Sequence, residues 1–99
     1  MQKIYIAGKI GGLTEEEYTK NFEEAEKYID SKLFQYISVS PLRLPHNHDR
    51  SWQSYMKEDI AALVKCDTVF ALRNWRESPG ATIEINLAIS LGIDVIFQK

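Results

Sequence analysis

The sequence predicts a three-layer α/β sandwich, in which a parallel sheet of four strands carries helices on both faces. Short apolar runs alternate with longer amphipathic segments along the 99 residues, which is typical of strands joined by crossover helices. Right-handed crossovers then place the strands in the spatial order 2-1-3-4, as in flavodoxin-like folds. A chain of this length with 44% hydrophobic residues can form a single core, so we expect one domain over residues 1–99.

Capping and turn residues set the predicted boundaries. Thr14 and Glu17 are spaced as a capping box at the start of the first helix. Ser78 can cap the last helix, Pro79 suits its first turn, and Gly92 ends it. The predicted elements are, in order, strand 3–7, turn 8–12, helix 14–31, strand 34–40, surface loop 41–51, helix 52–65, strand 67–72, helix 79–91 and strand 94–98.

The predicted topology also indicates where a ligand would bind. In a parallel sheet of this order, ligands bind beyond the carboxyl ends of the strands, where the strand order reverses. Here that point lies between the first and third strands, so the loops over residues 8–13 and 73–80 are expected to line a binding site.

Two acidic residues fall on helix faces that are otherwise apolar. At about 100° per residue, Glu84 lies inside the arc formed by Ile83, Ile85, Leu87, Ala88, Ile89 and Leu91. Asp59 likewise falls between Trp52, Tyr55, Met56, Ile60 and Leu63. Because burying an unpaired carboxylate costs several kcal/mol, the two acids indicate a shared polar pocket. Together they suit a nucleophile or general base with a proton-handling companion.

Both acids also have structural interpretations. The macrodipole stabilises an acid such as Glu84 near the start of a helix. Asp59 can be the ion-pair partner of Arg43, Arg50 or Lys9. If both acids are structural, the chain is an interaction protein.

Other residues near the predicted site suit a phosphate or a base. The turn Gly8-Lys9-Ile10-Gly11-Gly12 can bring backbone N–H groups close to an anion, although such turns also occur for steric reasons alone. The Ser78 hydroxyl group can contact a phosphate as well as cap its helix. Trp75, in a predicted loop, can stack on a heterocyclic base.

Composition argues against several classes of function. The net charge of -2 provides no basic field for polymeric nucleic acid, although a small phosphorylated ligand remains possible. Cys66, the single cysteine, excludes an internal disulfide and fits the cytoplasm, where we expect the protein. The short first apolar run predicts neither a signal peptide nor a membrane span. The segment His46-Asn47-His48-Asp49 lacks a matching ligand cluster, so we expect a solvated loop and no metal site.

Three motifs follow one another in a recognisable order: Tyr5-Ile6-Ala7-Gly8-Lys9-Ile10-Gly11-Gly12, the stretch from Asp59 to Asp67, and Ser78-x-Gly80-x-x-x-Glu84. Together they resemble the nucleoside 2-deoxyribosyltransferase superfamily over nearly the whole chain. The Tyr-Met-x-x-Asp and Gly-Ala-x-x-Glu motifs resemble a short branch classed as a domain of unknown function, similar to deoxynucleoside 5'-monophosphate N-glycosidases.

The resemblance implies an enzyme that cleaves the N-glycosidic bond of a nucleoside or its 5'-monophosphate. Glu84 would be the nucleophile that attacks the sugar C1' and expels the base, and Tyr5 would orient it. Asp59 would contact the sugar and help to handle protons, and Ser78 would contact a 5'-phosphate. The glycosyl-enzyme intermediate would pass to water or to a second base without a metal or an organic cofactor. The alternative is a non-catalytic nucleotide-binding or sensing module.

Departures from the family pattern refine this expectation. The transferases carry an aspartate where Ser78 stands, which favours hydrolysis of a monophosphate. The hydrolases carry an arginine where Gly11 stands, so phosphate binding would depend on Lys9. Characterised relatives continue beyond the position of Lys99 with a segment that completes the base pocket. A second copy would therefore supply this wall, in a homodimer or larger homo-oligomer.

Overall fold

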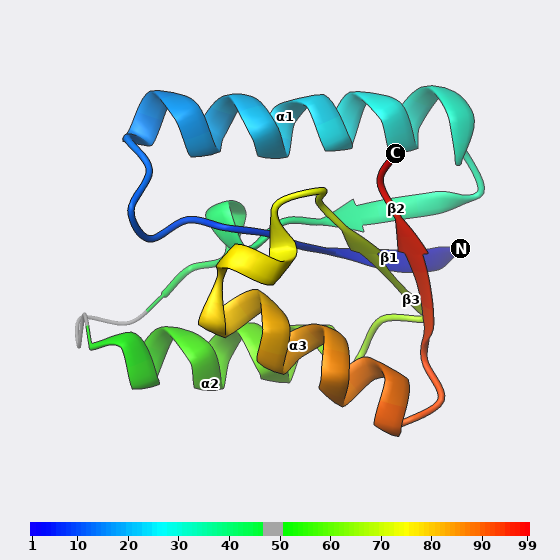
Figure 1. Cartoon of the computed structure of the whole chain (residues 1–99). Coiled ribbons are helices and arrows are strands. Elements are labelled where there is room, and N and C mark those ends of the chain that lie inside the picture. The colour runs from blue at the N-terminus through cyan, green and yellow to red at the C-terminus, as the bar shows by residue number, and fades with distance from the viewer. Residues whose placement is uncertain (47–50) are drawn as a thin grey trace.

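The computed structural model describes residues 1–46 and 51–99, shown in Figure 1. Its elements are, in order, β1 (Gln2–Ala7), α1 (Glu15–Lys32), β2 (Tyr36–Val39), η1 (Pro41–Arg43), α2 (Trp52–Leu63), β3 (Thr68–Ala71), η2 (Trp75–Glu77), α3 (Pro79–Ser90) and β4 (Asp94–Phe97). No helix within these described ranges is long and apolar enough to cross a membrane.

All four strands belong to one parallel sheet, in the order β2-β1-β3-β4. The predicted fold class and strand order are therefore confirmed. The observed strands are mostly shorter than predicted because only residues with a partner across the ladder count. In β2, for example, residues 36–39 pair with residues 2–5 of β1, whereas the prediction extended from 34 to 40.

Helices cover both faces of the sheet, with α1 on one face and α2 and α3 on the other (Figure 1). Successive residues of a strand point to opposite faces, so β1 contributes to two separate cores. Ile4 and Ile6 pack in the core beneath α1. Tyr5 and Ala7 pack in the core with α2 and α3. The sheet therefore directs Tyr5 toward the two helices that carry the candidate acids.

The predicted helix caps are confirmed. The Thr14 hydroxyl oxygen accepts from the Glu17 backbone N–H at 3.1 Å, and the Glu17 carboxylate accepts from the Thr14 backbone N–H at 2.9 Å. At the start of α3, the Ser78 hydroxyl oxygen accepts from the Ala81 backbone N–H at 3.1 Å. These bonds satisfy backbone donors that have no partner inside the helix.

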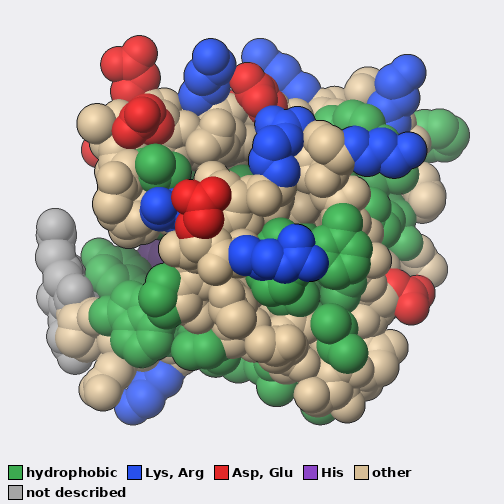
Figure 2. Space-filling model, in the orientation of Figure 1, with side chains coloured by type: hydrophobic (Ala, Val, Ile, Leu, Met, Phe, Trp, Pro, Cys, Tyr) green, Lys and Arg blue, Asp and Glu red, His purple; other side chains and the backbone are tan. Residues whose placement is uncertain are grey.

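The helix α3 is apolar on nearly all sides, yet the sheet covers only one of them. Ile83, Ile89 and Leu91 are 43%, 58% and 56% exposed. The prediction of one broad buried arc is therefore wrong for these residues, because a helix packed on a sheet buries only a stripe of its surface. Figure 2 shows charged side chains gathered over α1 and hydrophobic side chains over α2 and α3.

Gly8 follows β1 at a position where the chain passes close to a buried side chain. A Cβ atom at Gly8 would lie 2.3 Å from Leu72 Cδ1, whereas one at Gly11 would meet nothing within 4 Å. Leu72 is fully buried and has little room to move. We expect Gly8→Ala to lower the free energy of unfolding by about 1–3 kcal/mol, and Gly11→Ala by about 0.5 kcal/mol or less. Urea unfolding would measure both, and equal midpoints would contradict the close approach.

Candidate active site

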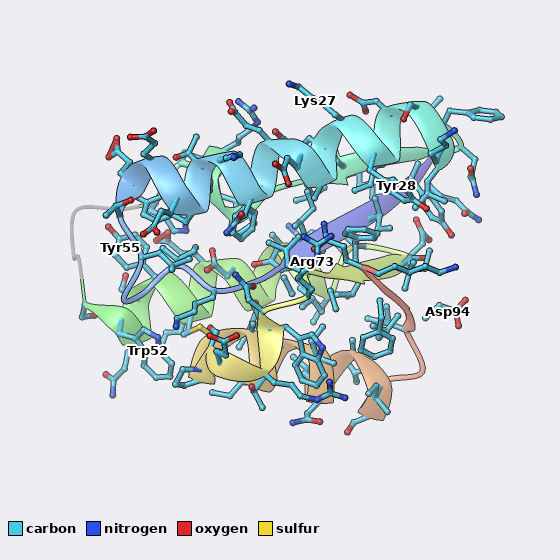
Figure 3. All side chains as sticks on the ribbon, turned by 45° about the horizontal axis from the view of Figure 1, so that its top comes forward. Lys27, Tyr28, Trp52, Tyr55, Arg73 and Asp94 are labelled. Carbon is cyan, nitrogen blue, oxygen red and sulfur yellow. The ribbon has the colours of Figure 1, made fainter. Side chains whose placement is uncertain are left out.

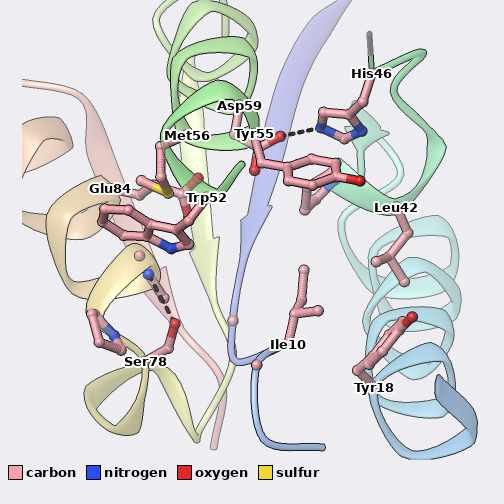
Figure 4. Close-up of a pocket in the computed structure, with 16 residues that line it drawn as sticks. Ile10, Tyr18, Leu42, His46, Trp52, Tyr55, Met56, Asp59, Ser78 and Glu84 are labelled. Carbon is pink, nitrogen blue, oxygen red and sulfur yellow. Dashed lines mark hydrogen bonds and ion pairs between the residues drawn. The ribbon is translucent and has the colours of Figure 1, made fainter. Parts of the chain in front are cut away.

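A cavity of about 510 Å³ opens at the carboxyl end of the sheet. Its walls come from the segments that follow β1, β2 and β3, and from the N-terminal parts of α2 and α3. Its apolar and aromatic lining includes Ile10, Tyr18, Leu42, Trp52, Tyr55 and Met56. Its carboxyl and imidazole groups are those of Asp59, Glu84 and His46 (Figure 4). Figure 3 shows Trp52 and Tyr55 at this end of the molecule, with Asp94 at the other. This volume is within the usual range for small-molecule sites.

The carboxyl group of Glu84 is held by a tyrosine from the sheet. The Tyr5 hydroxyl group donates a hydrogen bond to Glu84 Oε2 at 2.7 Å, and Glu84 is only 5% exposed. Burial raises the pKa of Glu84 to about 8, against the opposing effect of the Tyr5 hydrogen bond and with a further increase from the charge of Asp59. Burial also raises the pKa of Tyr5, as do the charges of Glu84 and Asp59, so Tyr5 remains a neutral donor.

The second acid, Asp59, is paired with a histidine. His46 Nε2 lies 2.8 Å from Asp59 Oδ1, and the His46 ring meets the Tyr55 ring edge-on with centroids 4.7 Å apart. Burial raises the pKa of Asp59, although the hydrogen bond and the charge of His46 act to lower it. In Figure 4, the His46 ring points toward Asp59 and lies beside Tyr55.

The sequence analysis did not find this partner of Asp59. Three cations were predicted as alternative ion-pair partners of Asp59. Arg43 instead forms an ion pair with Glu26, and Lys9 Nζ lies 3.4 Å from Glu77 Oε1. The third, Arg50, is outside the described residues.

The interpretation of residues 46–49 as a solvated loop is wrong for His46, which lines the cavity. The only sequence signal was a histidine in a segment without periodicity, 13 residues before Asp59. His48 and Asp49, the other potential ligands in this segment, lie outside the described residues. Within the described part of the chain, no group of three or more His, Cys, Asp or Glu side chains could hold a metal ion.

The structure brings most of the predicted site residues together. Besides Asp59 and Glu84, the predicted residues that line the cavity are Gly8, Ile10, Gly11, Ser78 and Gly80. Tyr5 reaches the site through its bond to Glu84. These positions agree with a site at the point where the strand order reverses.

Besides Tyr5, three predicted residues do not line this cavity: Lys9, Gly12 and Trp75. The Lys9 backbone N–H donates to Asn74 Oδ1 at 3.1 Å, which joins the two predicted loops. Trp75 packs against Phe97 and lies under the Arg76 guanidinium, 4.7 Å from the ring centroid. Stacking of Trp75 on a base therefore has no support from its position.

The arrangement of the sheet matches that of a solved structure described as a 2-deoxyribosyltransferase from the psychrotolerant bacterium Bacillus psychrosaccharolyticus. The match covers 96% of this chain and 70% of that chain, with a TM-score of 0.70 and 22% sequence identity. The protein thus has a nucleoside 2-deoxyribosyltransferase-like fold. The DUF4406 model, a domain of unknown function, matches residues 2–97, and the chain belongs to this family. A search of curated proteins found no match.

Proposed function

We propose that the protein cleaves the N-glycosidic bond of a nucleoside, with Glu84 as the nucleophile. The observation that carries this proposal is the buried Glu84 carboxyl group in the cavity wall, held at 2.7 Å by the Tyr5 hydroxyl group. A covalent nucleophile needs a defined orientation, which this hydrogen bond provides. Likeness in fold to a protein described as a 2-deoxyribosyltransferase adds support.

The reaction would proceed in two displacements at the sugar C1'. In the first, an ionised Glu84 oxygen bonds to C1' and the C1'–N bond breaks, so its electron pair leaves with the base, which takes a proton from solvent water. In the second, water or another base bonds to C1' and the Glu84 carboxylate leaves. Water then loses a proton to a nearby base, for which Asp59 is the candidate. Carboxylates suit the oxocarbenium-like charge that develops at C1' in both steps.

The charges of the cavity favour an uncharged nucleoside over its 5'-monophosphate. Apart from the Tyr18 and Tyr55 phenols, the acidic and basic groups among the described lining residues are two carboxyl groups and an imidazole. The Asp59 carboxylate would repel a phosphate, and the Lys9 ammonium group is directed to Glu77 instead. The Ser78 hydroxyl group can still contact a sugar hydroxyl group while it caps α3.

The test of this proposal is release of free base. Wild-type protein is incubated with a panel of ribo- and deoxynucleosides and their 5'-monophosphates, with and without an acceptor base, and products are followed by chromatography. Release from nucleosides supports the proposal. Release from monophosphates alone would overturn the charge argument. If no substrate reacts while calorimetry detects binding, the protein is a non-catalytic nucleotide-binding module.

We also propose that the protein forms a homodimer or larger homo-oligomer. The exposed apolar side chains of Ile83, Ile89 and Leu91 support this, because a partner subunit that covers them would remove apolar surface from water. Sedimentation velocity should give a mass at least twice that of the 11.4 kDa chain. A mass equal to that of one chain would refute the proposal. Location in the cytoplasm stays a prediction.

A further inference from the structure

The pair formed by His46 and Asp59 has a feature that ion pairs at the surface lack. Both side chains are largely enclosed, with 17% and 12% of their surface exposed, and both line the cavity. Only one oxygen of Asp59, Oδ1, bonds to a described residue, and that residue is His46. The other oxygen, Oδ2, has no hydrogen-bond partner among residues 1–46 and 51–99, and it is the oxygen that a bound molecule can donate to.

Two contacts, one of the backbone and one of the ring, restrict the position of the His46 side chain. The His46 backbone N–H donates to the Leu44 carbonyl oxygen at 2.9 Å, which keeps this part of the chain in a turn next to η1. The Tyr55 ring packs edge-on against the imidazole, one turn of α2 before Asp59. The imidazole therefore reaches Asp59 from a different segment of the chain and limits the rotation of its carboxyl group.

We propose that His46 is a positioning residue, which holds the Asp59 carboxylate by Oδ1 so that Oδ2 can accept a hydrogen bond from a substrate in the cavity. The identity of the substrate as a nucleoside rests on the function proposed above. The contact between His46 and Asp59 does not depend on which substrate binds. These two parts can therefore be tested separately.

Other titratable groups surround the pair and bear on its protonation. Glu58 and Tyr55 come from α2, Tyr5 from β1, Glu84 from α3 and Tyr18 from α1. Glu58 acts to raise the pKa of Asp59, and Asp59 in turn acts to raise the pKa of Glu84 and Tyr5. Among the described side chains, His46 is the group that acts to lower the pKa of Asp59. Its removal should therefore favour the protonated carboxyl group, which can no longer accept at both oxygens.

The first experiment needs no activity. Carboxyl ¹³C shifts of aspartate-labelled protein are followed as a function of pH in wild type, His46→Leu and His46→Gln, with Asp59→Asn to assign the signal. In His46→Leu the Asp59 midpoint should rise by about one pH unit or more. In His46→Gln, whose side-chain amide can still donate to Oδ1, the rise should be smaller. An unchanged midpoint in both variants would overturn the proposal. If His46→Leu does not fold, the comparison of His46→Gln with wild type decides.

The second experiment measures kcat/KM for base release against pH. We expect His46→Leu to lower kcat/KM by about 10- to 100-fold and to steepen its decline at low pH, where Asp59 takes up a proton in addition to Glu84, with partial rescue in His46→Gln. A merely structural histidine would lower thermal stability without steepening the low-pH decline of kcat/KM, and that result would overturn the positioning role. If wild type releases no base, the proposed function fails, whereas the carboxyl titration still decides whether His46 holds Asp59.

Discussion

Glu84→Gln should abolish base release and leave nucleoside binding close to that of wild type. The amide carries no negative charge and is a poor nucleophile, so neither attack on C1' nor stabilisation of the developing positive charge survives. We expect kcat to fall by about a thousandfold or more. The glutamine has nearly the same shape, and its carbonyl oxygen can still accept from the Tyr5 hydroxyl group, which bonds to Glu84 Oε2 in the wild type. The cavity should therefore keep its form.

Glu77→Gln is the matched control for this experiment. Glu77 is an exposed acid only seven residues before Glu84, pairs with Lys9 and does not line the cavity. Its kcat should remain within about twofold of wild type, as for a surface substitution away from the chemistry. Calorimetry with the same nucleoside checks that Glu84→Gln still binds. Base release by Glu84→Gln within tenfold of the wild-type rate would exclude Glu84 as the nucleophile.

The stability of the wild-type protein should fall as the pH rises from about 4.5 to 8, because of Glu84. In the folded protein burial raises the pKa of this group from 4.5 to about 8, whereas the unfolded chain ionises at the ordinary value. The stability associated with the neutral group is complete below pH 4.5, declines between 4.5 and 8, and is constant above that range. At 1.36 kcal/mol per pH unit, the decline amounts to at most about 5 kcal/mol. This is a large fraction of the stability of a small domain.

Comparison with Glu84→Gln isolates the effect, since glutamine does not titrate. Urea unfolding at intervals between pH 4.5 and 9 would give the free energy of unfolding of both proteins. As the pH rises, the free energy of unfolding of Glu84→Gln should increase relative to that of wild type. This difference should become constant near pH 8. The raised pKa of Asp59 affects both proteins and largely cancels in the difference. Parallel curves would show that Glu84 ionises at its ordinary pH and is not desolvated.

The neutral state of Glu84 also has a consequence for activity. With a pKa of about 8, about one in ten molecules of the free protein carries the ionised carboxylate at pH 7. The nucleophile must lose its proton before it attacks, and Asp59 shares the cavity with it. Because the charge of Asp59 acts to raise the pKa of Glu84, the contact of His46 with Asp59 would affect the attack of Glu84 on C1' as well as contact with the sugar.

The sequence by itself determined the order and type of the elements. Strand periodicity, the Thr14 capping box and the Ser78 cap depend on neighbours within a few residues, so they can be recognised without the fold. The place of Glu84 among apolar side chains predicted its burial for the same reason, because helical geometry relates residues three and four apart.

Only the tertiary structure decided which partners these residues meet. Helix periodicity defines a face but not how much of it the sheet covers, so the exposure of Ile83 could not be predicted. The contact of His46 with Asp59 joins two segments through the path of the chain after β2, which no local pattern describes. Lys9 turned to Glu77 for a similar reason, since side-chain pairing depends on how two loops approach each other. Local spacing therefore predicted the two acids, whereas packing between distant segments determined their surroundings.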